Sequence, residues 1–154
     1  MVVENRFGVL SRIVGVLSGR GFNIDTLSVS PMGNDALISR ITIKIHGDNR
    51  ALEQVTRHLG KLVNVISIDD CPSKGYIYRE LMLLRIHPNP ESYKRAIQIC
   101  EDFRATIVES NPVQLAVELN GSEEKISKFI SLMGPFGIEE IARTGTLSLR
   151  GVSP

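Results

Sequence analysis

The chain has 154 residues, of which 42% are hydrophobic and 23% charged, enough for a folded core in one medium domain or two small ones. Lys and Arg number 18 against 17 Asp and Glu, so the net charge of +1 argues against a nucleic-acid-binding protein, which normally has a basic face. No apolar run reaches the roughly 18 residues of a membrane span, and Met1–Val3 is too short to be a signal peptide. This start is also short for a complete strand, so we expect the chain to begin partway into its first strand.

The first half has the pattern of a split βαβ unit, with order β-α-β-β-α-β. After the apolar start, we expect a helix over residues 8–20 and two strands over 23–30 and 36–46. A second helix over residues 49–60 and a closing strand over 62–68 follow. Apolar residues recur at helical spacing after Gly8, and Gly21 stands where helix ends favour glycine. Ile41 and Ile43 alternate with polar residues, which is typical of a strand with one buried face.

The second half repeats this order after a short Pro- and Gly-containing linker. We therefore predict an α+β protein of two ferredoxin-like domains over residues 1–70 and 76–154, joined by a linker at 71–75. The expected elements are a strand, a helix, two strands, a helix and a strand over residues 79–87, 90–102, 105–110, 113–119, 123–133 and 138–149. Asn89 and Pro90 are the expected N-cap and first residue of the first of these helices. The run Leu81–Leu84 is expected to be buried on both faces, and residues 151–154 to form a frayed tail.

Nothing in the sequence forms a recognisable catalytic or metal-binding group. Two cysteines, Cys71 and Cys100, are far apart, and we expect both to be reduced thiols. The three histidines are scattered singly, without the spacing of a zinc motif: His46, His58 and His87. No serine has a histidine placed by a motif, and the Asp69–Asp70 pair reads as part of a solvated linker. We expect no catalytic residue, no metal and no cofactor on this chain.

Two turns are candidates for a small-ligand site. Gly8 opens a helix whose first N–H groups have no partner inside the helix, and a carboxylate or phosphate is favoured there. Asn5 precedes this turn, and Asn23 begins the strand after the helix with an amide that both donates and accepts. Because the two turns lie at opposite ends of one helix, we expect them to meet across a two-fold dimer, in which the amino-terminal sheets join. Taken singly, each residue is also an ordinary cap or turn residue.

The same order of elements also occurs in acylphosphatases, which hold a phosphate in the loop after the first strand with an Arg and place an Asn nearby. Arg6 with Asn34 or Asn49 would imitate this pair. The loop Asn5–Phe7 is too short to surround a phosphate with several successive N–H groups, which argues against this alternative.

Several segments resemble the small, regulatory subunits of acetolactate synthase (acetohydroxyacid synthase), whose amino-terminal part is an ACT domain. The resemblance covers nearly the whole chain, and its specific segments are Asn5–Ile13, Arg20–Val29, Lys61–Val65, Arg79–Leu83, Phe103–Ala105 and Ile141–Gly145. It implies two ferredoxin-like domains, a homodimer, and feedback inhibition by valine, or by leucine or isoleucine, in branched-chain amino-acid biosynthesis. It also implies a separate catalytic subunit that carries thiamine diphosphate, magnesium and FAD, and a cytoplasmic location, or the plastid stroma in a photosynthetic eukaryote.

Carried over residue by residue, the resemblance assigns roles to particular positions. Asn5 would bind the amino acid with its side chain and Gly8 with its backbone N–H group. Asn23 of the neighbouring subunit would close over the ligand, with Val29 near its side chain. The remaining candidate residues flank these positions: Val9, Leu10 and Ile24. Phe7 stands where the family often has a small residue or Pro, and its ring would narrow the site. The alternative from another class is a free-standing amino-acid sensor such as an ACT-type transcription regulator, although no helix-turn-helix or basic patch supports it.

Overall fold

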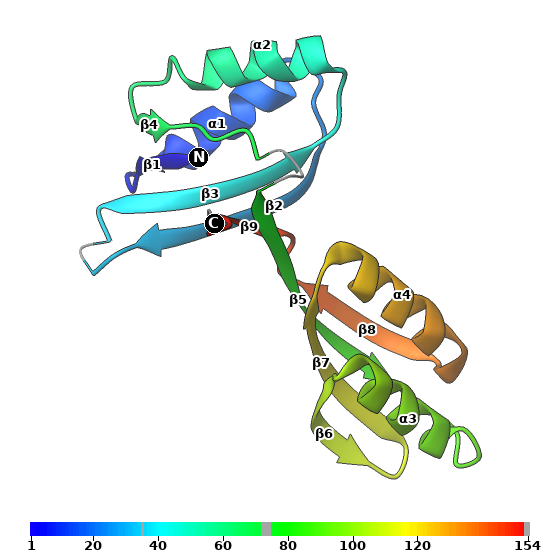
Figure 1. The fold of residues 1–154 in the computed structure, drawn as a ribbon. Coiled ribbons are helices and arrows are strands. Elements are labelled where there is room, and N and C mark those ends of the chain that lie inside the picture. Colours follow the sequence, from blue (N-terminus) through cyan, green and yellow to red (C-terminus); the bar gives the residue numbers. More distant parts are fainter. Residues whose placement is uncertain (35, 72–74, 153–154) are drawn as a thin grey trace. The chain divides into compact units, whose positions relative to one another are not determined.

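The computed structural model describes residues 1–34, 36–71 and 75–152, which divide into two compact units. One unit contains Met1–Tyr76 together with the segment from Ser148 onward, and the other contains Ile77–Leu147. The expected linker residues Pro72 and Ser73 lie outside the described residues. Each unit is an antiparallel sheet with two α-helices (Figure 1).

The first unit has the predicted order β-α-β-β-α-β. Its elements are β1 (Val2–Glu4), α1 (Val9–Ser18), β2 (Ile24–Met32), β3 (Ile38–Ile45), α2 (Asn49–Leu59) and β4 (Val65–Ser67). The strand order in the sheet is β2-β3-β1-β4, so β2 is an edge strand. Both helices lie on the same face of this sheet (Figure 1).

The core of the first unit lies between this face and the helices. It contains Val3, Val9, Ile13, Leu17, Ile41, Val55 and Leu59. The apolar positions of α1 recur every three or four residues, which puts them on one stripe toward the sheet. Asp48 caps α2 by accepting a hydrogen bond from the Ala51 N–H group at 2.7 Å, which fixes where this helix begins.

The second unit repeats the order. Its elements are β5 (Tyr76–Ile86), α3 (Tyr93–Phe103), β6 (Thr106–Asn111), β7 (Gln114–Gly121), α4 (Glu123–Met133), the 3₁₀ turn η1 (Gly134–Phe136) and β8 (Ile138–Arg143). The last strand, β9 (Leu147–Arg150), begins at the last residue of this unit and continues into the segment that belongs to the first unit. The strands follow the order β6-β7-β5-β8, and β9 also pairs with β5. Ser122 caps α4 by accepting from the Lys125 N–H group at 3.3 Å. The predicted fold class is therefore confirmed.

Two boundaries in the second unit differ from the predicted ones. The first helix begins at Tyr93 and not at Pro90, because Asn89 caps a preceding turn in which its side chain accepts from the Ser92 N–H group at 2.8 Å. The single strand predicted from Ile138 to Leu149 is two strands, β8 and β9. Gly145, at φ 74°, turns the backbone between them into the left-handed region, which is incompatible with an extended strand.

The prediction that the run Leu81–Leu84 is buried on both faces is wrong. Met82 and Leu84 are buried, whereas Leu83 between them is 47% exposed. Both helices of this unit cover the same face of the sheet (Figure 1). Alternate side chains of β5 therefore point to the opposite face, which these helices do not cover. The apolar run therefore reflects one buried face and one partly apolar open face.

An ion pair with a buried carboxylate joins β5 to β8. The Glu80 side chain is 1% exposed and accepts from Arg143 Nε at 2.6 Å and from Nη2 at 2.8 Å. Thr144 follows directly, and its hydroxyl accepts from the Leu81 N–H group at 3.1 Å. Donation to Glu80 raises the pKa of Arg143 above its ordinary value, so the guanidinium stays charged.

The end of the described chain is attached to the first unit. The Gly151 N–H group donates to the Gly75 carbonyl at 2.8 Å, and Arg150 Nη2 lies 3.7 Å from Asp69 Oδ2. The Cys71 thiol lies 3.4 Å from the Ser148 hydroxyl. The predicted frayed tail is thus tied down at Gly151, while residues 153–154 lie outside the described part of the chain.

Candidate functional site

The turn between β1 and α1 holds Asn5 in a fixed position. Its backbone N–H group donates to the Leu37 carbonyl at 2.8 Å, and its side-chain Nδ2 donates to the Ala36 carbonyl at 2.6 Å. Because the amide nitrogen is engaged in this way, the Oδ1 oxygen is the atom of this side chain that remains available as an acceptor.

Gly8 is the N-cap of α1 and adopts a left-handed conformation with φ 79°. No side chain caps this helix, so the N–H groups of its first turn lack a side-chain acceptor. No heavy atom outside the neighbouring residues lies within 4 Å of the position that a Cβ at Gly8 would take. The backbone here can therefore be approached closely by a small anion.

Large apolar side chains are exposed beside this turn. Phe7 is 105% exposed, Leu10 38% and Leu37 70%. Val9, in contrast, is buried in the core and turns away from solvent. Of the two candidate residues in the first turn of α1, Leu10 is therefore the one placed to contact a ligand or a partner.

Asn23 lies beyond the other end of α1 and is held by a carboxylate. Its Nδ2 donates to Asp25 Oδ1 at 3.0 Å, while the second oxygen of Asp25 contacts His46 Nδ1. The bond from Asn23, with a smaller contribution from His46, lowers the pKa of Asp25. As in Asn5, the engaged Nδ2 leaves Oδ1 as the available acceptor.

The two remaining candidates lie on β2. Ile24 pairs with Ile45 and packs against the core of the first unit. Val29 pairs with Ile41 on β3 but is 45% exposed, since it lies on the edge strand. Val29 thus presents nearly half of its apolar surface to solvent.

One copy of the chain does not bring the two turns together. The helix between them has 10 residues, which at about 1.5 Å per residue separates its ends by about 15 Å. A single small amino acid cannot touch both Gly8 and Asn23 across that distance. Asn5, Gly8 and Leu10 are grouped at one end of α1, whereas Asn23 and Ile24 lie at the other.

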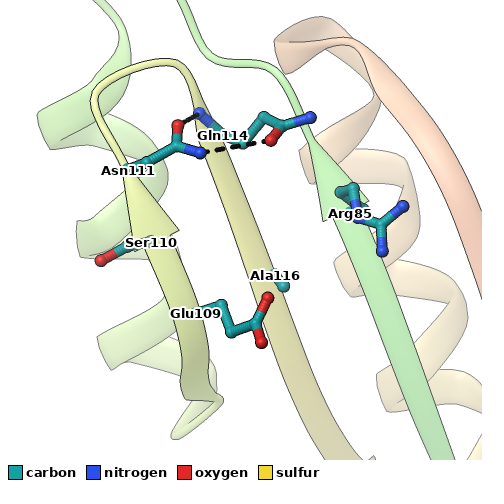
Figure 2. Close-up of a pocket in the computed structure, with 6 residues that line it drawn as sticks. All are labelled: Arg85, Glu109, Ser110, Asn111, Gln114 and Ala116. Carbon is teal, nitrogen blue, oxygen red and sulfur yellow. Dashed lines mark hydrogen bonds between the residues drawn. The ribbon is translucent and has the colours of Figure 1, made fainter.

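A second polar feature, a hollow on the open face of the second unit, was not predicted from the sequence. It has a volume of about 360 Å³ and is lined by Arg85, Glu109, Ser110, Asn111, Gln114 and Ala116 (Figure 2). Glu109, Ala116 and Arg85 face one another across neighbouring strands, and the small Ala116 forms the floor. Arg85 donates to Glu140 at 3.0 Å, so its charge is compensated within the unit. Strand register places Arg85 beside Ala116 and Glu109, and this register was not deducible from the spacing of the residues.

The described residues include no group of three or more His, Cys, Asp or Glu side chains that could hold a metal ion. Arg6, the phosphate ligand in the acylphosphatase alternative, lies 3.3 Å from Glu4, whose carboxylate would repel a phosphate. Among the described residues, no helix is both long and apolar enough to cross a membrane.

Comparison with known families gives two matches that together span most of the chain. Residues 1–67 match the AHAS small subunit-like ACT domain, and residues 79–151 match the family described as small subunit of acetolactate synthase. A probable acetolactate synthase small subunit of Archaeoglobus fulgidus is 40% identical over 97% of this chain and 92% of its own length. The acetolactate synthase small subunit of Aquifex aeolicus is 37% identical over 96% of this chain and 77% of its own length.

A plant protein and a solved structure extend these similarities. Acetolactate synthase small subunit 2, chloroplastic, of Arabidopsis thaliana is 36% identical over 96% of this chain, which corresponds to 30% of the plant protein. The crystal structure of the acetolactate synthase small subunit from Thermotoga maritima has a TM-score of 0.89 and 30% identity, covering 100% of this chain and 96% of that one.

Proposed function

This chain belongs to the family of acetolactate synthase small subunits, and we propose that it is a non-catalytic regulatory subunit whose effector is a branched-chain amino acid, with valine as the first candidate. The observation that carries the proposal is the pair of restrained amides, Asn5 and Asn23, whose Nδ2 atoms are engaged and whose Oδ1 atoms are available.

The chemistry of these groups suits the two charged ends of a free amino acid. The uncapped N-terminus of α1 offers N–H donors and a positive partial charge to a carboxylate. The amide oxygens of Asn5 and Asn23 are acceptors that suit an ammonium group. Leu10 and Val29 offer apolar surface for a branched side chain.

The site requires two copies of the chain in this proposal, since α1 separates its two halves by about 15 Å. A two-fold dimer places the first turn of one subunit against Asn23 of its neighbour. The outer edge of β2, which pairs with no other described strand, supports such a dimer because it can extend the sheet across the interface. The exposed Phe7 and Leu37 are further apolar surface of the kind that interfaces cover.

The partner is a separate catalytic subunit, and we assign thiamine diphosphate, magnesium and FAD to that partner. The small subunit would activate it and, with effector bound, inhibit it. We place both in the compartment of branched-chain amino-acid biosynthesis, the cytoplasm or a plastid stroma. The domain division that we propose is an amino-terminal ACT domain over residues 1–70, a linker at 71–75 and a regulatory domain from residue 76.

Calorimetry and thermal unfolding test the effector. Valine is expected to bind and raise the melting temperature, with a stabilisation of about 2.7 kcal/mol at 100 times the dissociation constant. Alanine lacks two carbon atoms of the valine side chain, each worth about 0.8 kcal/mol when buried, so it should bind about 15-fold more weakly. The absence of heat with millimolar valine, leucine or isoleucine would rule out the proposed sensor.

The substitution Asn23→Ala tests the link to regulation in the reconstituted enzyme. The variant should still activate the catalytic subunit but lose valine inhibition. Gln98→Ala is the matched control, because it also removes an amide that donates to a carboxylate, Asp102, at 3.1 Å on the other unit. Full valine sensitivity in Asn23→Ala would place the site elsewhere, and loss of folding would make Asn23 a structural turn residue.

A further inference from the structure

The carboxylate of Asp25 is directed at Asn23 by a local irregularity of the sheet. Pairing between β2 and β3 runs Ile24 with Ile45 and then Thr26 with Lys44, so Asp25 is an extra residue on β2, as in a β-bulge. Such an extra residue re-aims its side chain relative to the regular alternation of the strand. Here one carboxylate oxygen accepts from Asn23 Nδ2 at 3.0 Å and the other contacts His46, which follows the end of β3.

We propose that Asp25, supported by His46, is a positioning residue that makes the effector site selective for an amine. This inference rests on the proposed function of Asn23 as a ligand of the effector. Asp25 has only acceptor oxygens toward Asn23, so it fixes which end of the amide faces inward. The Asn23 nitrogen is retained by Asp25 and the oxygen faces the ligand, where it accepts a hydrogen bond from an ammonium group.

His46 determines how Asp25 itself is oriented. With the second carboxylate oxygen held by the imidazole, the first is directed at Asn23. Lys44, whose charge favours the ionised form of Asp25, is the other charged group that acts on this carboxylate. His46, Asp25 and Asn23 thus form a series of contacts that begins just after β3, and only Asn23 touches the ligand in this proposal.

Without Asp25 the Asn23 amide would rotate freely and present either its oxygen or its nitrogen. Valine would then have to order this side chain on binding, a cost that corresponds to roughly a threefold to tenfold loss of affinity. The analogue 3-methylbutanoate has the same carbon skeleton but lacks the amine, so it gains nothing from the Asn23 oxygen. Its affinity should not respond to Asp25.

The test compares valine with 3-methylbutanoate by calorimetry on the full chain. In Asp25→Ala the ratio of the two affinities should fall threefold to tenfold, through weaker valine binding alone. Asp25→Asn should keep most of the ratio, because its Oδ1 still accepts from Asn23 while its Nδ2 donates to His46. Glu53→Ala removes the same single negative charge from an exposed position of α2 and should change nothing.

A measurement without ligand separates this inference from the proposed function. Exchange of the Asn23 side-chain amide protons, followed by NMR, should be slowed in the unaltered protein and fast in Asp25→Ala. If valine binds but both the ratio and the exchange are unchanged in Asp25→Ala, the positioning role is overturned while the effector assignment stands. If valine does not bind at all, the effector assignment fails, and selectivity for an amine fails with it.

Discussion

The ion pair between Glu80 and Arg143 predicts an unequal response to removal of either partner. The Glu80 side chain is 1% exposed and the Arg143 side chain 36% exposed. Arg143→Gln therefore leaves a carboxylate that cannot reach water, whereas Glu80→Gln leaves a guanidinium that can. We expect the first substitution to be the more damaging one.

The magnitudes follow from the cost of an uncompensated charge. Removing one partner of a buried pair typically costs about 3–5 kcal/mol, and Arg143→Gln should lie in this range at pH 7. Glu80→Gln should cost about 1–2 kcal/mol, close to the loss of hydrogen bonds to a charged group.

Hydrogen exchange resolved by mass spectrometry measures this effect in each unit separately. Peptides from Ile77–Leu147 should lose protection by the stated amounts, while peptides from residues 1–71 serve as the internal control. Equal losses in the two variants would refute this account of the pair.

Three further outcomes are expected. Gly8→Ala should lower the free energy of unfolding by about 1–2 kcal/mol, because Gly8 has a φ of 79°. Gly15→Ala should raise the free energy of unfolding by about 1 kcal/mol, because Gly15 lies in the middle of α1 with open space around it. Equal effects of the two substitutions in denaturant titrations would contradict this backbone argument. A thiol reagent at pH 8 should label Cys71 and spare Cys100 until the protein unfolds, because burial raises the pKa of Cys100 to about 11; rapid labelling of both thiols in the native protein would count against this. Ser122→Ala should cost about 1 kcal/mol through loss of the α4 cap, seen as faster amide exchange in the first turn of that helix, and unchanged exchange there would mean that the cap contributes nothing.

Local chemistry in the sequence was sufficient for the order of elements. Helical periodicity after Gly8 located α1, because periodicity depends on neighbours along the chain. The prediction that Leu83 is buried failed because its exposure depends on which face of the sheet the helices cover. The early start predicted at Pro90 failed because Asn89 serves equally well in a turn and in a cap.

The candidate site was predictable only in part, for the same reason. Gly8 and Asn23 were identified from the turns they occupy and from the family resemblance. The hydrogen bonds that hold the site side chains could not be identified in this way, since Asn5 bonds to Ala36, and Asp25 to His46, across long stretches of chain. The hollow lined by Glu109 and Arg85 likewise depends on strand register, which the alternation of residue types along one strand does not fix.

The return of the chain to the first unit at Ser148 has a consequence for the order in which the protein is completed. In terms of connectivity, Ile77–Leu147 is an insertion within the first unit, so the contact of Gly151 with Gly75 closes a loop that contains the whole second unit. Closing a flexible loop of this length would cost about 4 kcal/mol of chain entropy. Pairing of β5 with β9 removes most of this entropy cost, because Gly75 directly precedes β5 and Gly151 directly follows β9. During synthesis, the segment from Ser148 onward emerges last, so its contacts with Gly75 and Asp69 are the last part of the first unit to form.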